Sequence, residues 1–262
     1  MVYAQNHPTI SDAMAHTNNQ SVAFKSYDIF QSSTIPLSAD LKTIATDVES
    51  VDVNASVLSD IQEDQPDFIQ FSIAHAAETY TIKLQRVNLF ADDFQLRNQN
   101  DEILDYNRGL YYRGKIAGHQ ESVAVFNFFS ESLNGIISER NKGNIIIGQL
   151  KDSDTYVVYS DQSMTVNQDF TCEVNDIEQM QEIPSQNQML TNSNQTSKCV
   201  RVFYELTNDI YQNNNSSVSD TMNWMSSVHN IVATLYSDQN IPTVLSDVLI
   251  WQQLDPYTGE NG

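Results

Sequence analysis

Apolar and polar side chains alternate along much of the first 165 residues. The clearest alternation begins at Ile69, Phe71 and Ile73, and it recurs over residues 80–84. A repeat of two residues is typical of a β-strand with one buried face. The segment Ala76-Ala77-Glu78 separates the two runs and predicts a hairpin connection.

Five further strand signals follow in quick succession, separated by short segments that are suited to turns. They cover residues 110–116, 122–129, 133–138, 144–149 and 156–159. Closely spaced strands with short turns predict an antiparallel meander, packed as a sandwich or a partial barrel. Residues 92–107 are acidic, rich in Asn and Gln and without periodicity, so we expect a surface loop there.

The pattern changes in the C-terminal quarter of the chain. Residues 173–197 consist largely of Gln, Asn, Ser and Thr, a composition that predicts a linker. Apolar residues then alternate over 200–206, recur every third or fourth position over 218–236, and dominate 244–251. This order predicts a strand, an amphipathic helix and a second strand, which together form a βαβ unit.

These patterns predict an α+β protein in which a β-rich antiparallel domain is followed by the start of an α/β (βαβ) domain. The expected boundaries are a disordered N-terminus over residues 1–25, a β-rich domain over 26–165, a linker over 166–198 and an α/β segment over 199–262. Two strands cannot bury both faces of a sheet. We therefore expect the second domain to continue beyond Gly262 and the chain to be a fragment.

The charge of the chain excludes some partners. It has 13 Lys and Arg against 34 Asp and Glu, which gives a net charge of −21. Nucleic acids and anionic membrane surfaces attract basic patches, so neither is an expected partner. No apolar run approaches the roughly 20 residues that cross a bilayer, so no membrane span is expected.

The first residues bear on the cellular compartment. The segment Val2-Tyr3-Ala4-Gln5 carries small or β-branched residues at the positions that a signal peptidase reads, although no apolar region precedes it. We interpret the chain as secreted and as beginning inside a signal peptide; the alternative is an ordinary cytosolic N-terminus. Two cysteines are too few for a disulfide framework and do not decide between these readings.

Several motifs resemble a known family. Residues 111–118 (YYRGKIAG), 122–125 (SVAV) and 135–137 (GII) resemble the propeptide of reprolysin-type (ADAM-like) zinc metalloproteases. Residues 203–206 (FYEL), together with Asn240-Ile241, Ile250-Trp251 and Asp255-Pro256, resemble the start of the catalytic domain of that family. The resemblance covers residues 67–160 and 198–257 and implies the N-terminal part of a zincin-type protease domain behind a propeptide.

The resemblance implies the precursor of a secreted zinc metalloendopeptidase, whose propeptide folds and inhibits the protease. The implied partners are its own protease domain and, for the full enzyme, protein or peptide substrates. The implied cofactors are zinc and calcium. Lys198 is the one basic residue after Lys151 and before Cys199, so an Arg-rich processing signal is missing, which favours a bacterial setting. The alternatives are an extracellular β-rich binding or adhesion module and a free-standing protease inhibitor.

The zinc-binding hallmark of that family does not occur in this sequence. The motif H-E-x-x-H-x-x-G-x-x-H supplies three zinc ligands and a general base. The five histidines do not fit this spacing; they are His7, His16, His75, His119 and His229. We therefore expect the chain as given to be inactive, with the zinc motif beyond Gly262.

Three residues are candidate site residues. The resemblance gives Cys172 the place of an inhibitory cysteine, whose thiolate would occupy the zinc position that water needs for catalysis. A Cys172–Cys199 disulfide, closing a loop of about 28 residues, is the first alternative, and two unpaired thiols are the second. The resemblance also gives Glu205 the place of a calcium ligand, against the reading of a solvent-facing strand residue.

Overall fold

The computed structural model describes residues 23–140, 142–151, 153–165 and 199–257. Strands make up 44% of the structure and helices 23%. The protein is thus mostly β, and its largest element is one curled sheet that forms a half-barrel. The expected α+β arrangement, a β-rich propeptide domain followed by the truncated start of an α/β protease domain, is wrong.

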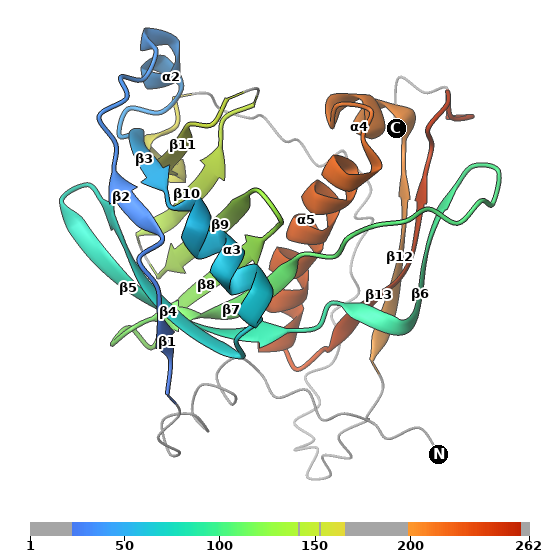
Figure 1. Ribbon diagram of the computed structural model, residues 1–262, viewed down its shortest axis with the longest axis horizontal. Helices are drawn as coiled ribbons and strands as arrows, with labels where there is room; N and C mark the ends of the chain where they lie inside the picture. Colours follow the sequence, from blue (N-terminus) through green and yellow to red (C-terminus); the bar gives the residue numbers. More distant parts are fainter. Residues whose placement is uncertain (1–22, 141, 152, 166–198, 258–262) are drawn as a thin grey trace, which may run out of the picture.

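Ten strands of the described residues form the curled sheet (Figure 1). From one edge to the other they are β1 (Lys25–Ser26), β4 (Phe68–His75), β5 (Glu78–Val87), β7 (Leu110–Ile116), β8 (Ser122–Phe128), β9 (Leu133–Glu139), β10 (Gly143–Gln149), β11 (Tyr156–Ser160), β3 (Glu49–Val53) and β2 (Phe30–Ser32). All neighbours are antiparallel except β1 and β4.

The strands predicted from the alternating pattern are confirmed. β4 and β5 form the predicted hairpin, and β7 to β11 form the predicted meander. Ala76 and Ala77 connect β4 and β5 with φ of 49° and 63°. Two central residues with positive φ are typical of the tight turns whose twist matches that of paired strands.

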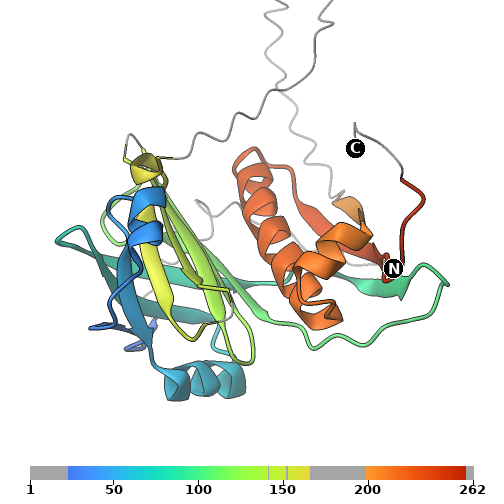
Figure 2. The same cartoon turned by 90° about the horizontal axis from the view of Figure 1, so that it is seen from above.

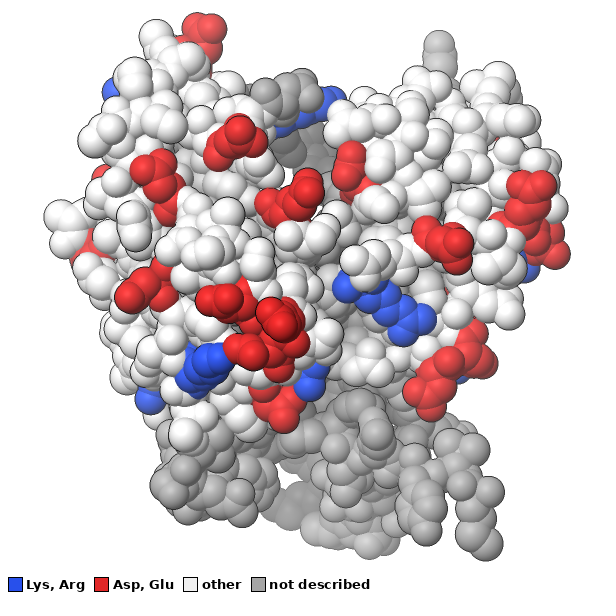
Figure 3. Space-filling view, viewed as in Figure 1, with Lys and Arg blue, Asp and Glu red and all other residues white. Residues whose placement is uncertain are grey.

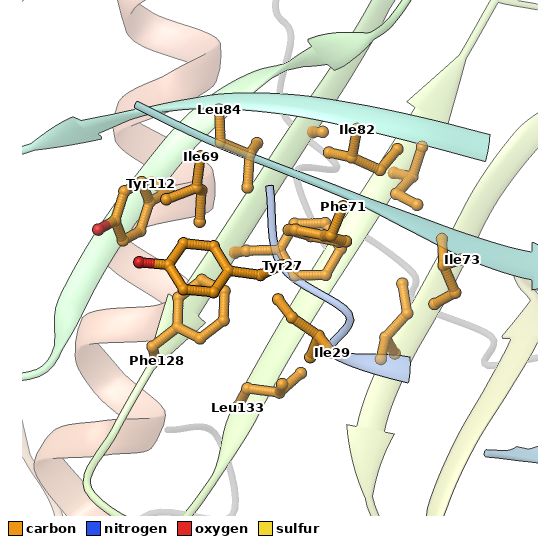
Figure 4. Close-up of a cluster of buried hydrophobic side chains, with 14 of the residues drawn as sticks. Tyr27, Ile29, Ile69, Phe71, Ile73, Ile82, Leu84, Tyr112, Phe128 and Leu133 are labelled. Carbon is orange, nitrogen blue, oxygen red and sulfur yellow. The ribbon is translucent and has the colours of Figure 1, made fainter. Parts of the chain in front are cut away.

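The concave face of the curled sheet holds the main hydrophobic core (Figure 4). Alternate residues of β4, β5, β7 and β8 point into it, as the period of two requires. Ten of the buried side chains are labelled in the figure: Tyr27, Ile29, Ile69, Phe71, Ile73, Ile82, Leu84, Tyr112, Phe128 and Leu133. Tyr112 and Phe128 meet edge to face, with ring centroids 5.5 Å apart.

Two helices accompany the N-terminal strands. α3 (Ala55–Asp64) starts at Asn54, whose side chain accepts a hydrogen bond from the backbone N–H of Ser56. It buries Leu58 and Ile61 in the main core and therefore covers part of the concave face. α2 (Ala39–Ile44) is short and has no buried residue.

A second, smaller sheet joins distant parts of the chain. It consists of β12 (Val200–Leu206), β13 (Thr243–Ile250) and β6 (Phe90–Asn98), in that order and all parallel. The surface loop expected over residues 92–107 is therefore wrong for its first part, which belongs to β6. The strand–helix–strand order predicted for the C-terminal segment is confirmed, because β12 and β13 flank a long helix.

That helix, α5 (Val218–Asp238), lies between the two sheets (Figure 2). Ser217 caps its start by accepting a hydrogen bond from the N–H of Asp220, and the carboxylate of Asp220 suits the positive end of the helix. The short helix α4 (Asn208–Asn213) precedes α5, and a 3-10 turn, η1 (Asp161–Ser163), follows β11.

A second hydrophobic core unites the two parts of the chain. Residues 89–129 supply Leu89, Phe90, Leu96, Tyr111 and Phe129. Residues 206–250 supply the remaining buried members: Leu206, Met222, Met225, Leu245, Val248 and Ile250. The C-terminal segment therefore folds against the curled sheet and against β6, and it does not form a core by itself.

Gly114, in the YYRGKIAG motif, provides a stability test of the curled sheet. A Cβ added there would lie 1.9 Å from the carbonyl oxygen of Lys83 on the neighbouring strand. We expect Gly114→Ala to lower the free energy of unfolding by about 1–3 kcal/mol, because backbone must move to relieve the overlap. Urea unfolding measures the change. Gly148→Ala is the matched control, since a Cβ there meets nothing within 4 Å; equal losses in both variants would contradict this explanation.

Candidate functional site

The convex face of the curled sheet carries a polar contact with α5. Arg113 on β7, Asn127 on β8 and Asn134 on β9 point away from the main core and toward this helix. Asn127 is buried with 1% of its surface exposed, and Asn230 on α5 is buried with 0% exposed. Buried amides of this kind are stable only when they are hydrogen-bonded.

A continuous series of hydrogen bonds satisfies these groups. Asn230 accepts from Nε of Arg113 at 2.7 Å and donates to Asn127 at 2.7 Å. Asn127 donates to Asn134 at 2.7 Å, and Asn134 donates to Ser227 at 3.0 Å. The network links three strands of the curled sheet to two successive turns of α5. It fixes the rotation of the helix, because a buried amide left unpaired costs about 1–3 kcal/mol.

Two tyrosines extend the network toward the small sheet. The hydroxyl of Tyr106 donates to Asn223 of α5 at 3.0 Å and lies 3.1 Å from the hydroxyl of Tyr111. Burial raises the pKa of both phenols, so they remain neutral hydrogen-bonding groups. The contact between the sheet and α5 is therefore polar in its centre and apolar at the side of the second core.

His229 is the titratable group of this contact. Its Nδ1 lies 3.2 Å from the hydroxyl of Tyr204 on β12, and its Nε2 is buried and has no hydrogen-bond partner among the described residues. Burial, and secondarily the charge of Arg113, lowers the pKa of His229 to about 4. The imidazole is therefore neutral at neutral pH.

Arg113 brings a charge into the same contact. Burial lowers the pKa of its guanidinium to about 10, so the group stays protonated at neutral pH. A protonated His229 next to it would place two positive charges at one partly desolvated interface. The geometry thus favours one charge here, that of Arg113.

This arrangement joins two parts of one chain. The Arg, Asn and Ser side chains of the network are hydrogen-bonded to one another. The part of the chain that the structure describes contains no group of three or more His, Cys, Asp and Glu placed to hold a metal ion.

Of the two cysteines, the structure describes Cys199. Cys172 lies outside the described residues, so both the zinc-ligand role and the Cys172–Cys199 disulfide stay predictions. Cys199 lies at the start of β12 with its thiol 3.3 Å from the carbonyl oxygen of Pro242. Burial raises the pKa of the Cys199 thiol, which disfavours the thiolate that a metal or an electrophile would require.

Glu205, the predicted calcium ligand, lies exposed on β12. Its Oε1 accepts hydrogen bonds from the indole of Trp251 at 2.7 Å and from the hydroxyl of Tyr257 at 2.6 Å. The hydrogen bond to Glu205 raises the pKa of Tyr257. The carboxylate thus joins the residues that follow β13 to the neighbouring strand, and its calcium role stays a prediction.

The other described histidines belong to the curled sheet. His75, at the end of β4, is buried with Nε2 3.1 Å from Asp47 and Nδ1 3.6 Å from Glu49. His119 lies 2.6 Å from Glu139 and is partly exposed.

Comparison with known proteins gives no family assignment: no family model matches the chain, and no curated protein matches it. None of the described helices, α5 included, is both long and apolar enough to cross a membrane.

Proposed function

We propose that the protein is the precursor region of a secreted zinc metalloendopeptidase, in which residues 23–165 hold residues 199–257 in a folded and covered form. The resemblance of the sequence motifs supports the protease class. The observation that carries the holding role is β6, which leaves the curled sheet after Val87 and pairs in parallel with β13.

The contacts of β6 support this role. Register pairs run from Leu245↔Phe90 to Ile250↔Asn98, so the N-terminal part completes the sheet of the C-terminal part. Adding a strand to a sheet edge satisfies main-chain groups that would otherwise be open to association with other chains. Without residues 23–165, residues 199–257 would lack one strand of their sheet and about half of their core. Their helix α5 would also lose its buried hydrogen bonds to the curled sheet.

A cut between the two parts tests the holding role. We expect a chain with an inserted specific protease site between residues 165 and 199 to stay together after complete cleavage. The two pieces should co-elute in size-exclusion chromatography and separate only in denaturant, because a shared apolar core and buried hydrogen bonds remain. Separation of the cut pieces in buffer alone would contradict the proposal.

The protease class needs an independent test. Reading the coding sequence after codon 262 should reveal H-E-x-x-H-x-x-G-x-x-H in frame, within about 100 residues. Expression of that longer chain should give a peptidase whose activity requires zinc. An unrelated domain in that place would favour the extracellular β-rich binding module and reject the protease.

A further inference from the structure

The curled sheet has an open seam between its two edges. β1 pairs with β4 only at Lys25↔Ile69 and Ser26↔Gln70. The chain makes one more hydrogen bond to this edge, from the N–H of Tyr27 to the carbonyl of Gln70, and then crosses to pair with β3 as β2. From Phe71 onward, no described residue pairs with this edge of β4.

Among the described residues, the backbone groups at this edge of β4 have no pairing partner beyond Gln70. The carbonyl of Gln70 faces away from β5, since it accepts from Tyr27. Backbone groups of an antiparallel strand face the two sides alternately. The N–H and C=O groups of Ser72 and Ala74 therefore also face outward, and both residues are exposed. On the other side of the seam, the carbonyl of Ile29 points toward β3, because it accepts a hydrogen bond from the N–H of Asn54. By the same alternation, the backbone groups of Phe30 and Ser32 on β2 point away from β3 and toward the seam.

A cavity of about 600 Å³ lies at this seam and is lined by Ser72, Ala74, Phe30 and Ser32. Ligand sites in proteins have volumes of roughly 300–1,000 Å³. Ile35 and Leu37 add apolar surface to its wall, and 48% of the surface of Ile35 is exposed. The cavity thus combines apolar surface for side chains with two strand edges that the described residues leave unpaired.

The charges beside the cavity indicate what it accepts. Lys42 of α2 lines it. Among the described lysines and arginines, Lys42 is the one whose side chain has neither a hydrogen bond, an ion pair nor a ring contact. Acidic side chains outnumber basic ones on the face in Figure 3, so an unpaired cation is unusual in this chain. Glu49, also in the lining, lies 3.6 Å from His75.

We propose that this seam binds an extended polypeptide segment, which adds to the β4 edge in line with β1 and places an acidic side chain next to Lys42. Main-chain pairing with Ser72 and Ala74 supplies the hydrogen bonds, and the apolar wall receives an alternate side chain. This is strand addition to an exposed sheet edge. The proposal is independent of the protease assignment.

Selection of peptides tests the seam. Random octapeptides displayed on phage are selected on the intact protein. We expect the enriched peptides to share an Asp or Glu and to bind Lys42→Gln about tenfold more weakly than the unchanged protein, the ratio expected when one charge-assisted contact is lost. Lys151→Gln, which removes the same charge from an exposed lysine elsewhere, should leave binding unchanged.

Two further measurements locate the peptide. Ala74→Pro removes one outward N–H without touching the ladder to β5, and should reduce binding at least tenfold. In the unchanged protein, amide exchange at Ser72 and Ala74 should slow when the synthetic peptide binds, which requires no variant to fold. The proposal is wrong if no peptide is enriched or if Lys42→Gln leaves the affinity for the peptide unchanged. It is also wrong if peptide binding does not slow amide hydrogen exchange at Ser72 and Ala74.

Discussion

Leu96→Ala is expected to weaken the attachment of the C-terminal segment to β6. Leu96 is 3% exposed and belongs to the core that both parts of the chain share. Removing a buried leucine side chain typically costs about 2–5 kcal/mol, because apolar contact is lost and a cavity remains. Leu96 lies on β6, the strand that pairs with β13, so the lost packing weakens the attachment of β13.

Tryptophan fluorescence during urea unfolding measures this effect. The chain has two tryptophans, Trp224 and Trp251, and both lie in the C-terminal segment. Their transition should move to lower urea in Leu96→Ala. Gln95→Ala, at the exposed neighbouring position of the same strand, is the matched control and should shift it little. If both variants behave alike, β6 does not hold the segment.

The sequence predicted the curled sheet well because its signal is local. Each strand of the meander buries one face in the main core, so apolar residues appear at every second position, as in Ile69, Phe71 and Ile73. The turns between strands are short, and their residues are close in the sequence to the strands they join. Strand positions and antiparallel order follow from such patterns, but the closure of the sheet by β1 and β2 does not.

β6 escaped prediction for a physical reason. Asp92 and Asp93 are exposed and interrupt the alternation, so the segment has the composition of a loop. Its pairing partner, β13, lies about 150 residues later in the chain, and no local pattern reports such a pair. The error in fold class has the same origin, because β6 joins the C-terminal segment to the β-rich part and both belong to one mostly β structure.

The polar contact with α5 left one signal in the sequence. Asn127 lies between Phe126 and Phe128 on a central strand, where its side chain must point to the convex face. The side chain of Asn127 is only 1% exposed, which shows that this face is covered as well. A single Asn does not identify its cover, however, and Asn230 on a helix predicted as amphipathic looks like an ordinary polar position. The partners become visible only when both elements are in place.

Acidification is expected to destabilise the protein through His229. Its pKa is about 4 in the folded protein and 6.5 in the unfolded reference, mainly because the ring is buried. A lowered histidine pKa means that the unfolded chain binds the proton more strongly. The stabilisation is thus fully present above pH 6.5 and is lost as the pH falls from 6.5 toward 4.

The size of the effect follows from the shift. One pKa unit corresponds to about 1.4 kcal/mol, so this histidine accounts for about 3 kcal/mol in total and about 2 kcal/mol of loss by pH 5. The proton would also enter beside Arg113, whose charge adds to the cost. Carboxyl groups such as Glu139, whose pKa is lowered by its hydrogen bond to His119, lose their contribution mainly below this window.

Urea unfolding at pH 5, 6 and 7 measures the free energy of unfolding for the unchanged protein and for His229→Gln. The variant has no titrating group at this position, so its stability should depend much less on pH across the window, whatever its absolute value. His119→Gln is the matched control, because His119 is 44% exposed and outside the contact with α5. Parallel pH profiles for the unchanged protein and His229→Gln would show that the buried imidazole does not cause the acid sensitivity. If the free energy of unfolding becomes less dependent on pH in His229→Gln but not in His119→Gln, the acid sensitivity arises at the contact that joins the two parts of the chain.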